Sequence, residues 1–204
     1  MRIIDGVATT AGDVTFAACG VWRNEFDIQY VRDPSGGTAI LTIRPIRAED
    51  NPRMTEIIRQ VMTEFGAVGE GYSIEDPEVD DMYGSYSTRR AAFFIAERNG
   101  ETLGGAGVAH LAGADDDVCE LRKMYVLREG RGLGLGRTLL DTCLAAAREL
   151  AYGTCYLETL EHMRAARRLY EAYGFQSLAA PMGHTGHFGC DNWYALDLGS
   201  GEGT

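Results

Sequence analysis

The sequence predicts a mixed α+β fold, in which antiparallel strands lead into a glycine-rich loop and an amphipathic helix. Three observations support this class. Two strand-like runs flank the turn dipeptide Asn99-Gly100, three glycines fall within residues 132–136, and residues 137–152 have the apolar spacing of a helix. A chain of 204 residues, 45% of them hydrophobic, suits one domain with a sizeable core.

The first strand and helix are expected after residue 39. Residues 40–46 have the pattern of a strand, and a helix can begin at Asp50 or Asn51 and run to about Phe65. Pro52 would stand at the first helical position, where its missing N–H leaves no helical hydrogen bond unmade. The apolar stripe of this helix consists of Ile57, Ile58, Val61, Met62 and Phe65.

The middle of the chain reads as an antiparallel meander. Asn-Gly supplies the positive φ angles of a type I′ turn, so residues 92–98 and 102–111 are expected to form a hairpin. The glycines at 104, 105 and 107 predict a weakened strand, a bulge or a close approach of another group. Residues 118–126 form the next strand and lead into the glycine-rich loop.

The C-terminal part alternates between helices and strands. A buried strand is expected at 154–159 and a second helix at about 162–173, with Gly174 ending that helix in the left-handed conformation. Two final strands are expected at 175–178 and 192–198.

Composition and charge exclude several function classes. The formal charge of −11 disfavours nucleic acid and anionic membranes as partners, and it is compatible with a cationic substrate such as an amine. No apolar stretch approaches the roughly 18 residues of a transmembrane helix, and no secretory signal is evident. Five cysteines, an odd number spread along the chain, indicate no disulfide framework, so we expect a cytoplasmic protein.

The loop between residues 131 and 136 is suited to a pyrophosphate. Glycines let backbone N–H groups approach a ligand closely, and the following helix adds unpaired N–H groups and the positive end of its dipole. A P-loop is excluded because Arg131 and Arg137 stand where that motif needs Gly and Lys, and Arg137 also breaks the dinucleotide pattern GxGxxG. An ordinary glycine-rich connection between a strand and a helix is the alternative interpretation.

Two motifs together give the sequence a family resemblance. Arg131, Gly134 and Gly136 fit the pattern Gln/Arg-x-x-Gly-x-Gly/Ala, and residues 165–175 contain Ala-x-x-Leu-Tyr-x-x-x-Gly-Phe. Both patterns, in this order, resemble the GNAT N-acetyltransferase superfamily. The resemblance implies a central, mostly antiparallel twisted sheet of about six to seven strands flanked by about four helices.

The resemblance covers residues 40–198. It leaves residues 1–39 as an N-terminal extension of unknown role, an extra hairpin or a poorly ordered segment, and residues 199–204 as a flexible tail.

The family's chemistry sets the expected function. The resemblance implies transfer of the acetyl group of acetyl-CoA to a primary amine by direct attack in a ternary complex, without a metal. We expect a small amine or an amino acid as the acceptor, with a protein N-terminus or lysine as the alternative. A non-catalytic acyl-CoA-binding sensor or interaction module is the alternative function, and a homodimer is compatible with either.

Acetyl transfer needs a base to deprotonate the amine and benefits from an acid for the leaving thiolate. The resemblance assigns the acid to Tyr170, for which packing in the core is the alternative role. It assigns the base to Glu120, with Glu158 as the rival, and either can act through water. The alternative for both carboxylates is an ion pair with arginine on a strand face.

The resemblance also implies where the cofactor would bind. Backbone groups of Met124, Tyr125 and Val126 are expected to contact the pantetheine and the oxyanion. The pyrophosphate is expected at Arg131, Gly132, Leu133, Gly134, Leu135, Gly136 and Arg137, mainly through N–H groups. Met163 stands near the position where many members carry an Asn, so a side-chain contact to the pantetheine is not expected there.

Two further loops bear on the acceptor. The acidic loop 70–81 could attract a cation, or it could be a solvated acidic surface. The segment 183–191 contains His184, His187 and Cys190 with a spacing that can bind zinc, but no fourth ligand is evident. We therefore expect no metal; a loop that closes over the acceptor or a purely structural connection are the alternatives.

Overall fold

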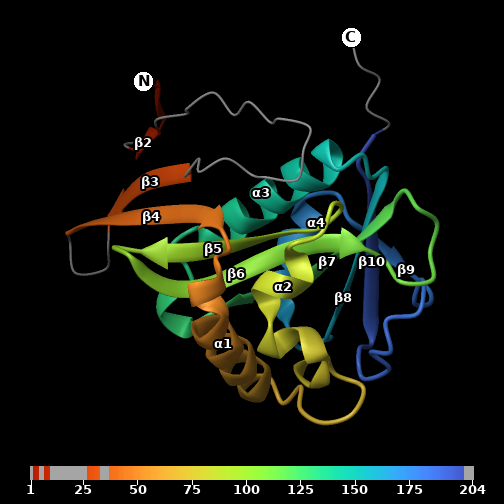
Figure 1. The fold of residues 1–204 in the computed structure, drawn as a ribbon. Coiled ribbons are helices and arrows are strands. Elements are labelled where there is room, and N and C mark those ends of the chain that lie inside the picture. The colour runs from red at the N-terminus through yellow and green to blue at the C-terminus, as the bar shows by residue number, and fades with distance from the viewer. Residues whose placement is uncertain (1, 5–6, 10–26, 33–36, 200–204) are drawn as a thin grey trace.

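One twisted sheet organises the molecule (Figure 1). The computed structural model describes residues 2–4, 7–9, 27–32 and 37–199. Within them, ten strands follow the order β1-β2-β3-β4-β5-β6-β7-β8-β10-β9. The strands are β1 (Arg2–Ile4), β2 (Val7–Thr9), β3 (Asp27–Arg32), β4 (Thr38–Pro45), β5 (Ala92–Arg98), β6 (Glu101–His110), β7 (Val118–Val126), β8 (Thr154–Thr159), β9 (Gln176–Leu178) and β10 (Asn192–Asp197). The predicted antiparallel meander is confirmed, and β1–β3 extend the sheet beyond it.

Four α-helices in the described residues cover the sheet, as predicted. They are α1 (Asn51–Glu64), α2 (Met82–Tyr86), α3 (Leu135–Glu149) and α4 (Arg164–Ala172), with short 3₁₀ turns at 48–50, 73–75, 77–80 and 128–130. Figure 1 shows α1 and α2 in front of the sheet and α3 and α4 behind it. None of the helices in the described part of the chain has the length and apolar character needed to cross a bilayer.

Helix α1 turns its predicted stripe into the core. Ile57 and Ile58 are fully buried, and Phe65 packs half-buried at the end of the helix. Neither expected residue caps the helix through its side chain. The Asp50 carboxylate instead accepts hydrogen bonds from the Arg44 guanidinium at 2.6 and 2.8 Å, because that buried cation on β4 needs a partner.

The hairpin between β5 and β6 has the predicted turn. Asn99 and Gly100 have φ angles of 52° and 82°, the two positive values of a type I′ turn. The glycines of β6 mark both a bulge and a close approach. The register with β7 shifts between Gly105 and Gly107, and a Cβ on Gly105 would lie 2.6 Å from the Phe93 ring.

The single parallel pairing among the described strands creates an opening in the sheet. Strands β7 and β8 pair in parallel only from Val118 to Glu120, opposite Thr154 to Tyr156. Beyond that point β8 continues with β10 and β7 continues with β6. Among the strands that the structure describes, none therefore lies beside the main chain of β7 after Glu120 on the β8 side.

Candidate active site

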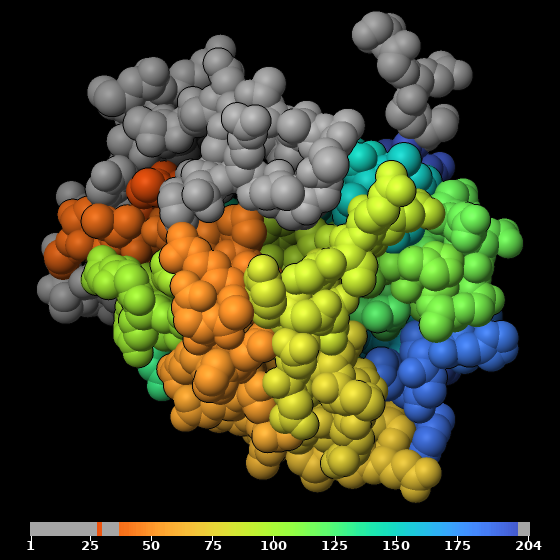
Figure 2. Space-filling view, viewed as in Figure 1, coloured from red at the N-terminus to blue at the C-terminus, as the bar shows by residue number. Residues whose placement is uncertain are grey.

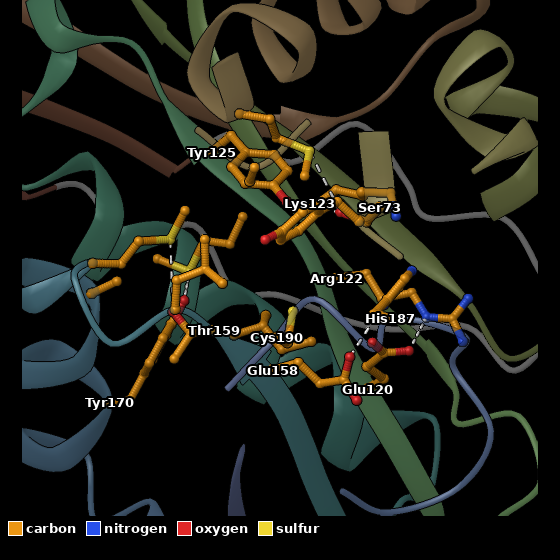
Figure 3. Close-up of a pocket in the computed structure, with 18 residues that line it drawn as sticks. Ser73, Glu120, Arg122, Lys123, Tyr125, Glu158, Thr159, Tyr170, His187 and Cys190 are labelled. Atoms are coloured by element: carbon orange, nitrogen blue, oxygen red, sulfur yellow. Dashed lines mark hydrogen bonds and ion pairs between the residues drawn. The ribbon is translucent and has the colours of Figure 1, made fainter. Parts of the chain in front are cut away.

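A pocket lies where β7 and β8 separate (Figure 3). Its empty volume is about 690 Å³, with its open mouth included. The lining residues come from α1, the loop after it, β7, β8, α4 and the segment before β10. They are Met62, Ala67, Tyr72, Ser73, Glu120, Leu121, Arg122, Lys123, Met124, Tyr125, Glu158, Thr159, Leu160, Met163, Ala166, Tyr170, His187 and Cys190.

A backbone irregularity in β7 faces this pocket. Lys123 has a φ of 51°, a left-handed conformation that is uncommon for a residue other than glycine. It lies in the stretch where β7 shifts register against β6. The bulge takes the main chain at Lys123 and Met124 out of regular pairing, so its polar groups can meet a ligand in the opening.

Glu120 and Glu158 lie together at one end of the pocket (Figure 3). The side chain of Glu120 is 6% exposed and accepts a hydrogen bond from Arg122 Nε at 2.6 Å. Burial raises the pKa of Glu120 above its ordinary value, and the nearby Arg122 charge only partly offsets this. A carboxylate with a raised pKa is a stronger base, which suits proton removal near neutral pH.

Glu158 is held by more partners than Glu120. Its oxygens accept hydrogen bonds from Tyr156 Oη at 2.7 Å and from Thr185 Oγ1 at 3.0 and 3.1 Å. His187 Nδ1 lies 3.2 Å from the same carboxylate. The structure brings both candidate bases to one place, but the sequence did not predict the hydrogen bonds that surround Glu158.

The acidic loop turns part of its charge inward. Asp76 and Glu78 both pair with the buried Lys123 ammonium, the second at 2.9 Å, and Asp80 pairs with Arg59 on α1 at 2.7 Å. The Lys123 side chain is only 1% exposed. Three carboxylates of the loop therefore hold it against β7 and α1 through ion pairs. Their charge is partly neutralised, and the loop is more than a solvated surface.

Tyr170 lies at the opposite end of the pocket from the two carboxylates in Figure 3. Helix α4 ends with two hydrogen bonds, from Gly174 N to Glu171 O and from Phe175 N to Tyr170 O, which is the Schellman pattern. The rings of Tyr170 and Phe175 are 5.8 Å apart. The Leu-Tyr-x-x-x-Gly-Phe sequence thus fixes the Tyr170 hydroxyl in the pocket, 3.9 Å from Met124 Sδ.

The ionisation states of the pocket hydroxyl and thiol groups follow from burial. Burial raises the pKa of Tyr170 well above its ordinary value, so the phenol remains protonated and able to donate. Burial also raises the pKa of Cys190 to about 12, which keeps this thiol neutral and a poor nucleophile.

The glycine-rich loop enters α3 as the sequence indicated. Gly132 and Gly134 have φ angles of 78° and 90°, and a Cβ on either would meet no atom within 4 Å. The N–H groups of the first helical turn, residues 135–137, have no partner within the helix. The Arg131 side chain, in contrast, points to the protein and binds both Glu64 oxygens at 2.7 and 2.8 Å. Leu135 is buried, so it can offer only its backbone.

The expected pantetheine residues differ in their positions. Met124 and Tyr125 line the pocket, where the Tyr125 hydroxyl lies 3.0 Å from Ser73 Oγ. Val126 does not line it, and its carbonyl accepts a hydrogen bond from Arg131 Nε at 2.9 Å. Met163 lines the pocket as an apolar group, and its sulfur is 3.7 Å from Thr159 Oγ1.

The residues of the His-x-x-His-x-x-Cys segment, whose spacing can bind zinc, do not come together. His184 turns away, with its ring beside Gly113 in the loop after β6, whereas His187 and Cys190 line the pocket. A different set is close together: Glu120, Glu158 and His187 each place one ligand atom within 4.8 Å of the others. The sequence singled out each of these three residues but not their meeting.

Sequence comparison finds that this chain is similar to acetyltransferases. The model of the acetyltransferase (GNAT) family matches residues 52–175. The chain is 40% identical over 150 residues to YjgM, an uncharacterised N-acetyltransferase of Escherichia coli K12, and the match covers 73% of this chain and 90% of YjgM. An uncharacterised N-acetyltransferase of Schizosaccharomyces pombe is 28% identical over 122 residues, covering 59% of this chain and 73% of the relative.

Solved structures share the fold. A GNAT-family acetyltransferase from Staphylococcus aureus Mu50 aligns with a TM-score of 0.68 at 22% identity, over 78% of this chain and 99% of that protein. The acetyltransferase yncA from Salmonella typhimurium, whose structure holds acetyl-CoA as its cofactor, aligns with a TM-score of 0.64 at 22% identity, over 80% of this chain and 96% of yncA. At these identities the likeness establishes the fold alone.

Proposed function

This chain belongs to the acetyltransferase (GNAT) family, and from that premise we propose that it transfers the acetyl group of acetyl-CoA to a primary amine of a small molecule. The observation that carries the proposal is the opening between β7 and β8. It has a bulged main chain on one side, two carboxylates at one end and a buried phenol at the other. An extended thioester arm fits along the unpaired side of β7 as an added strand would.

The glycine-rich loop supports the cofactor part of the proposal. Its left-handed glycines and the first turn of α3 present N–H groups with open space around them, which suits a pyrophosphate. The Arg131 guanidinium is already paired with Glu64, so in this proposal it braces the loop while the backbone binds the phosphates.

The carboxylates support the amine as acceptor. In the proposed reaction Glu120 takes a proton from the incoming ammonium, directly or through a water molecule, and the neutral nitrogen attacks the thioester carbonyl. Backbone N–H groups of the β7 bulge stabilise the oxyanion that forms. The C–S bond then breaks, the leaving thiolate takes the proton of Tyr170, and the nitrogen gives up its second proton to the Tyr170 phenolate, directly or through water. This gives the amide and free CoA and restores Tyr170, while the first proton passes from Glu120 to solvent.

The test is release of free CoA from acetyl-CoA, measured across a panel of primary amines, amino acids and peptides. We expect turnover with a small amine and a fall of about 10²–10⁴ in rate for Tyr170→Phe, the effect typical of losing one acid–base group. The affinity for acetyl-CoA should stay near that of the wild type. If peptides are the best acceptors, the acceptor is a protein N-terminus or lysine and not a small amine. If turnover is undiminished in Tyr170→Phe, Tyr170 is a packing residue.

Binding without turnover is the outcome that favours a sensor. Acetyl-CoA that binds, but releases CoA with no acceptor of the panel, would support the non-catalytic alternative. In that case, retained acetyl-CoA binding in Tyr170→Phe would say nothing about a catalytic role of Tyr170.

A further inference from the structure

Two segments that are far apart in the sequence meet over the carboxylate end of the pocket. Gly189 N donates to Gly71 O at 3.0 Å, the Phe188 ring covers Gly71, and the Tyr72 ring covers Gly189. A Cβ on either glycine would lie 2.5 Å from the ring above it. We call residues 71–76 and 187–190 the arch. In Figure 2 the yellow loop and the blue C-terminal segment meet on the surface at this place.

His187 joins the arch to the floor of the pocket. Its Nε2 lies 3.0 and 3.2 Å from the two Asp76 oxygens, and its Nδ1 lies 3.2 Å from Glu158 Oε2. An ionised carboxylate can only accept hydrogen bonds, so each ring nitrogen must donate. An imidazole with two N–H groups is a cation, so this geometry fits a protonated His187 between two ionised carboxylates.

The surroundings of His187 favour that charge. It faces Asp76 from the loop after α1, Glu158 from β8, and Glu120 and Lys123 from β7. On its own segment, Thr185 Oγ1 accepts a hydrogen bond from His187 N, and the Cys190 thiol also lines the pocket. Burial lowers the pKa of His187, but the hydrogen bonds to Asp76 and Glu158 outweigh this and raise it to about 9.

We propose that His187 is a positioning residue that, as an imidazolium, ties Asp76 to Glu158 and thereby closes the arch over the acceptor end of the pocket. This inference rests on the proposed function for its effect on the acceptor. Its chemical core, a doubly protonated His187 in the free protein, does not.

The pH dependence follows from the sign of the shift. A histidine whose folded pKa is about 9, above its ordinary 6.5, adds stability that is fully present below pH 6.5 and lost as the pH rises through 9. The arch should therefore loosen in alkaline solution. His184 provides a matched control, because it is exposed, lies three residues away and does not line the pocket.

The direct test is the ¹⁵N NMR spectrum of the histidine rings in the full chain, without CoA or acceptor and after treatment with a chelator. His187 is assigned by the signal lost in His187→Gln. We expect both ring nitrogens to be protonated at pH 7.5 and to titrate near pH 9. A neutral ring at pH 7.5 would overturn the proposal. A ¹⁵N chemical shift of Nδ1 typical of a metal-bound imidazole after zinc is added would also overturn it. A zinc ion among Glu120, Glu158 and His187 would then replace the proton.

The kinetic arm uses an acceptor identified by CoA release. His187→Gln should raise the acceptor KM roughly tenfold or more, a loss of about 1.4 kcal/mol or more in binding, and leave the acetyl-CoA Kd unchanged. The wild-type rise in acceptor KM above pH 9 should disappear in this variant, while His184→Gln should behave as the wild type. Equal acceptor KM in His187→Gln and wild type would overturn the closing role. If no acceptor is found at all, the proposed function fails, and the NMR result still decides the charge of His187.

Discussion

At the scale of single residues, Glu120 and Glu158 show how environment separates two neighbouring carboxylates. Glu158 accepts hydrogen bonds from Tyr156 and Thr185 and faces His187, so its oxygens are occupied by partners. Within the described part of the chain, Glu120 accepts a hydrogen bond from one donor, Arg122, and burial raises its pKa. The geometry therefore favours Glu120 as the base and Glu158 as an anchor of the 183–191 segment.

This assignment predicts different kinetic signatures for two variants. Glu120→Gln should lower kcat/KM by about 10²–10⁴ and remove the limb of the pH–rate profile that rises as Glu120 loses its proton. Glu158→Gln should act mainly on the acceptor KM, since the segment above it loosens. A Glu120→Gln profile that matches the wild type would exclude Glu120, and the reverse ranking of the two variants would move the base to Glu158.

At this scale the sequence predicted the candidate reacting groups but not their partners. Glu120, Glu158 and Tyr170 each sit in a motif or on a predicted strand, and the pocket brings all three together. The contact between His187 and Asp76 joins positions 111 residues apart. Such a pairing depends on how two loops pack in three dimensions, and the only local signal was a histidine in a glycine-rich segment.

At the scale of elements, the loop before α3 carries the cofactor prediction. Gly134 is the residue before the helix, has a φ of 90° and has open space around its Cα. A valine there would place its side chain where the N–H groups of residues 135–137 face a ligand. A valine would also strain the backbone, because side chains disfavour positive φ.

A second glycine serves as a control that distinguishes backbone strain from blocked cofactor binding. Gly100 has a φ of 82°, also with no atom within 4 Å, and it lies in the hairpin turn away from the pocket. Gly134→Val should weaken acetyl-CoA binding roughly tenfold or more in calorimetry, a difference of about 1.4 kcal/mol, while Gly100→Val binds normally. Equal affinity in both folded variants would remove this loop from the cofactor site.

At the scale of the whole molecule, the order of elements was predictable because each has a local signal. Strand periodicity, the Asn99-Gly100 turn and Gly174 at a helix end all act within a few residues. The separation of β7 from β8 depends on pairing between distant segments. Strands β1–β3 pair with neighbours in the chain, within the stretch for which the sequence left an extra hairpin or a poorly ordered segment as alternatives. The role of Asp50 was missed for a different reason: its partner Arg44 is only six residues away, but their pairing depends on the burial of both side chains.

A buried ion network ties together β4, β5 and the 3₁₀ turn at 48–50 that precedes α1. Arg44 pairs with Asp50 and with Glu97 at 2.6 Å each, and the Arg44 and Asp50 side chains are both 8% exposed. Burial favours the neutral form of Asp50, but the hydrogen bonds from Arg44 and Arg47 lower its pKa below 3.8. This contribution is present above pH 3.8 and is lost as the pH falls through the folded pKa.

Arg44→Ala should therefore destabilise the fold by about 3–5 kcal/mol, because it leaves buried carboxylates without their cation. The measurement is the free energy of unfolding from denaturant titration at neutral pH. Arg53→Ala is the matched control, since Arg53 pairs with Glu56 on the surface of α1, where an ion pair contributes about 0–1 kcal/mol. Equal losses in both variants would contradict the structural role of the network.

The central claim is that the opening between β7 and β8 holds acetyl-CoA for transfer, and the structure of the acetyl-CoA complex tests it most directly. We predict that the thioester lies along β7 at the Lys123 bulge, with its sulfur toward Tyr170 and its carbonyl carbon facing Glu120. The pyrophosphate should contact the backbone N–H groups of residues 132–137. A thioester bound outside this opening, or a pyrophosphate away from the start of α3, would contradict the account.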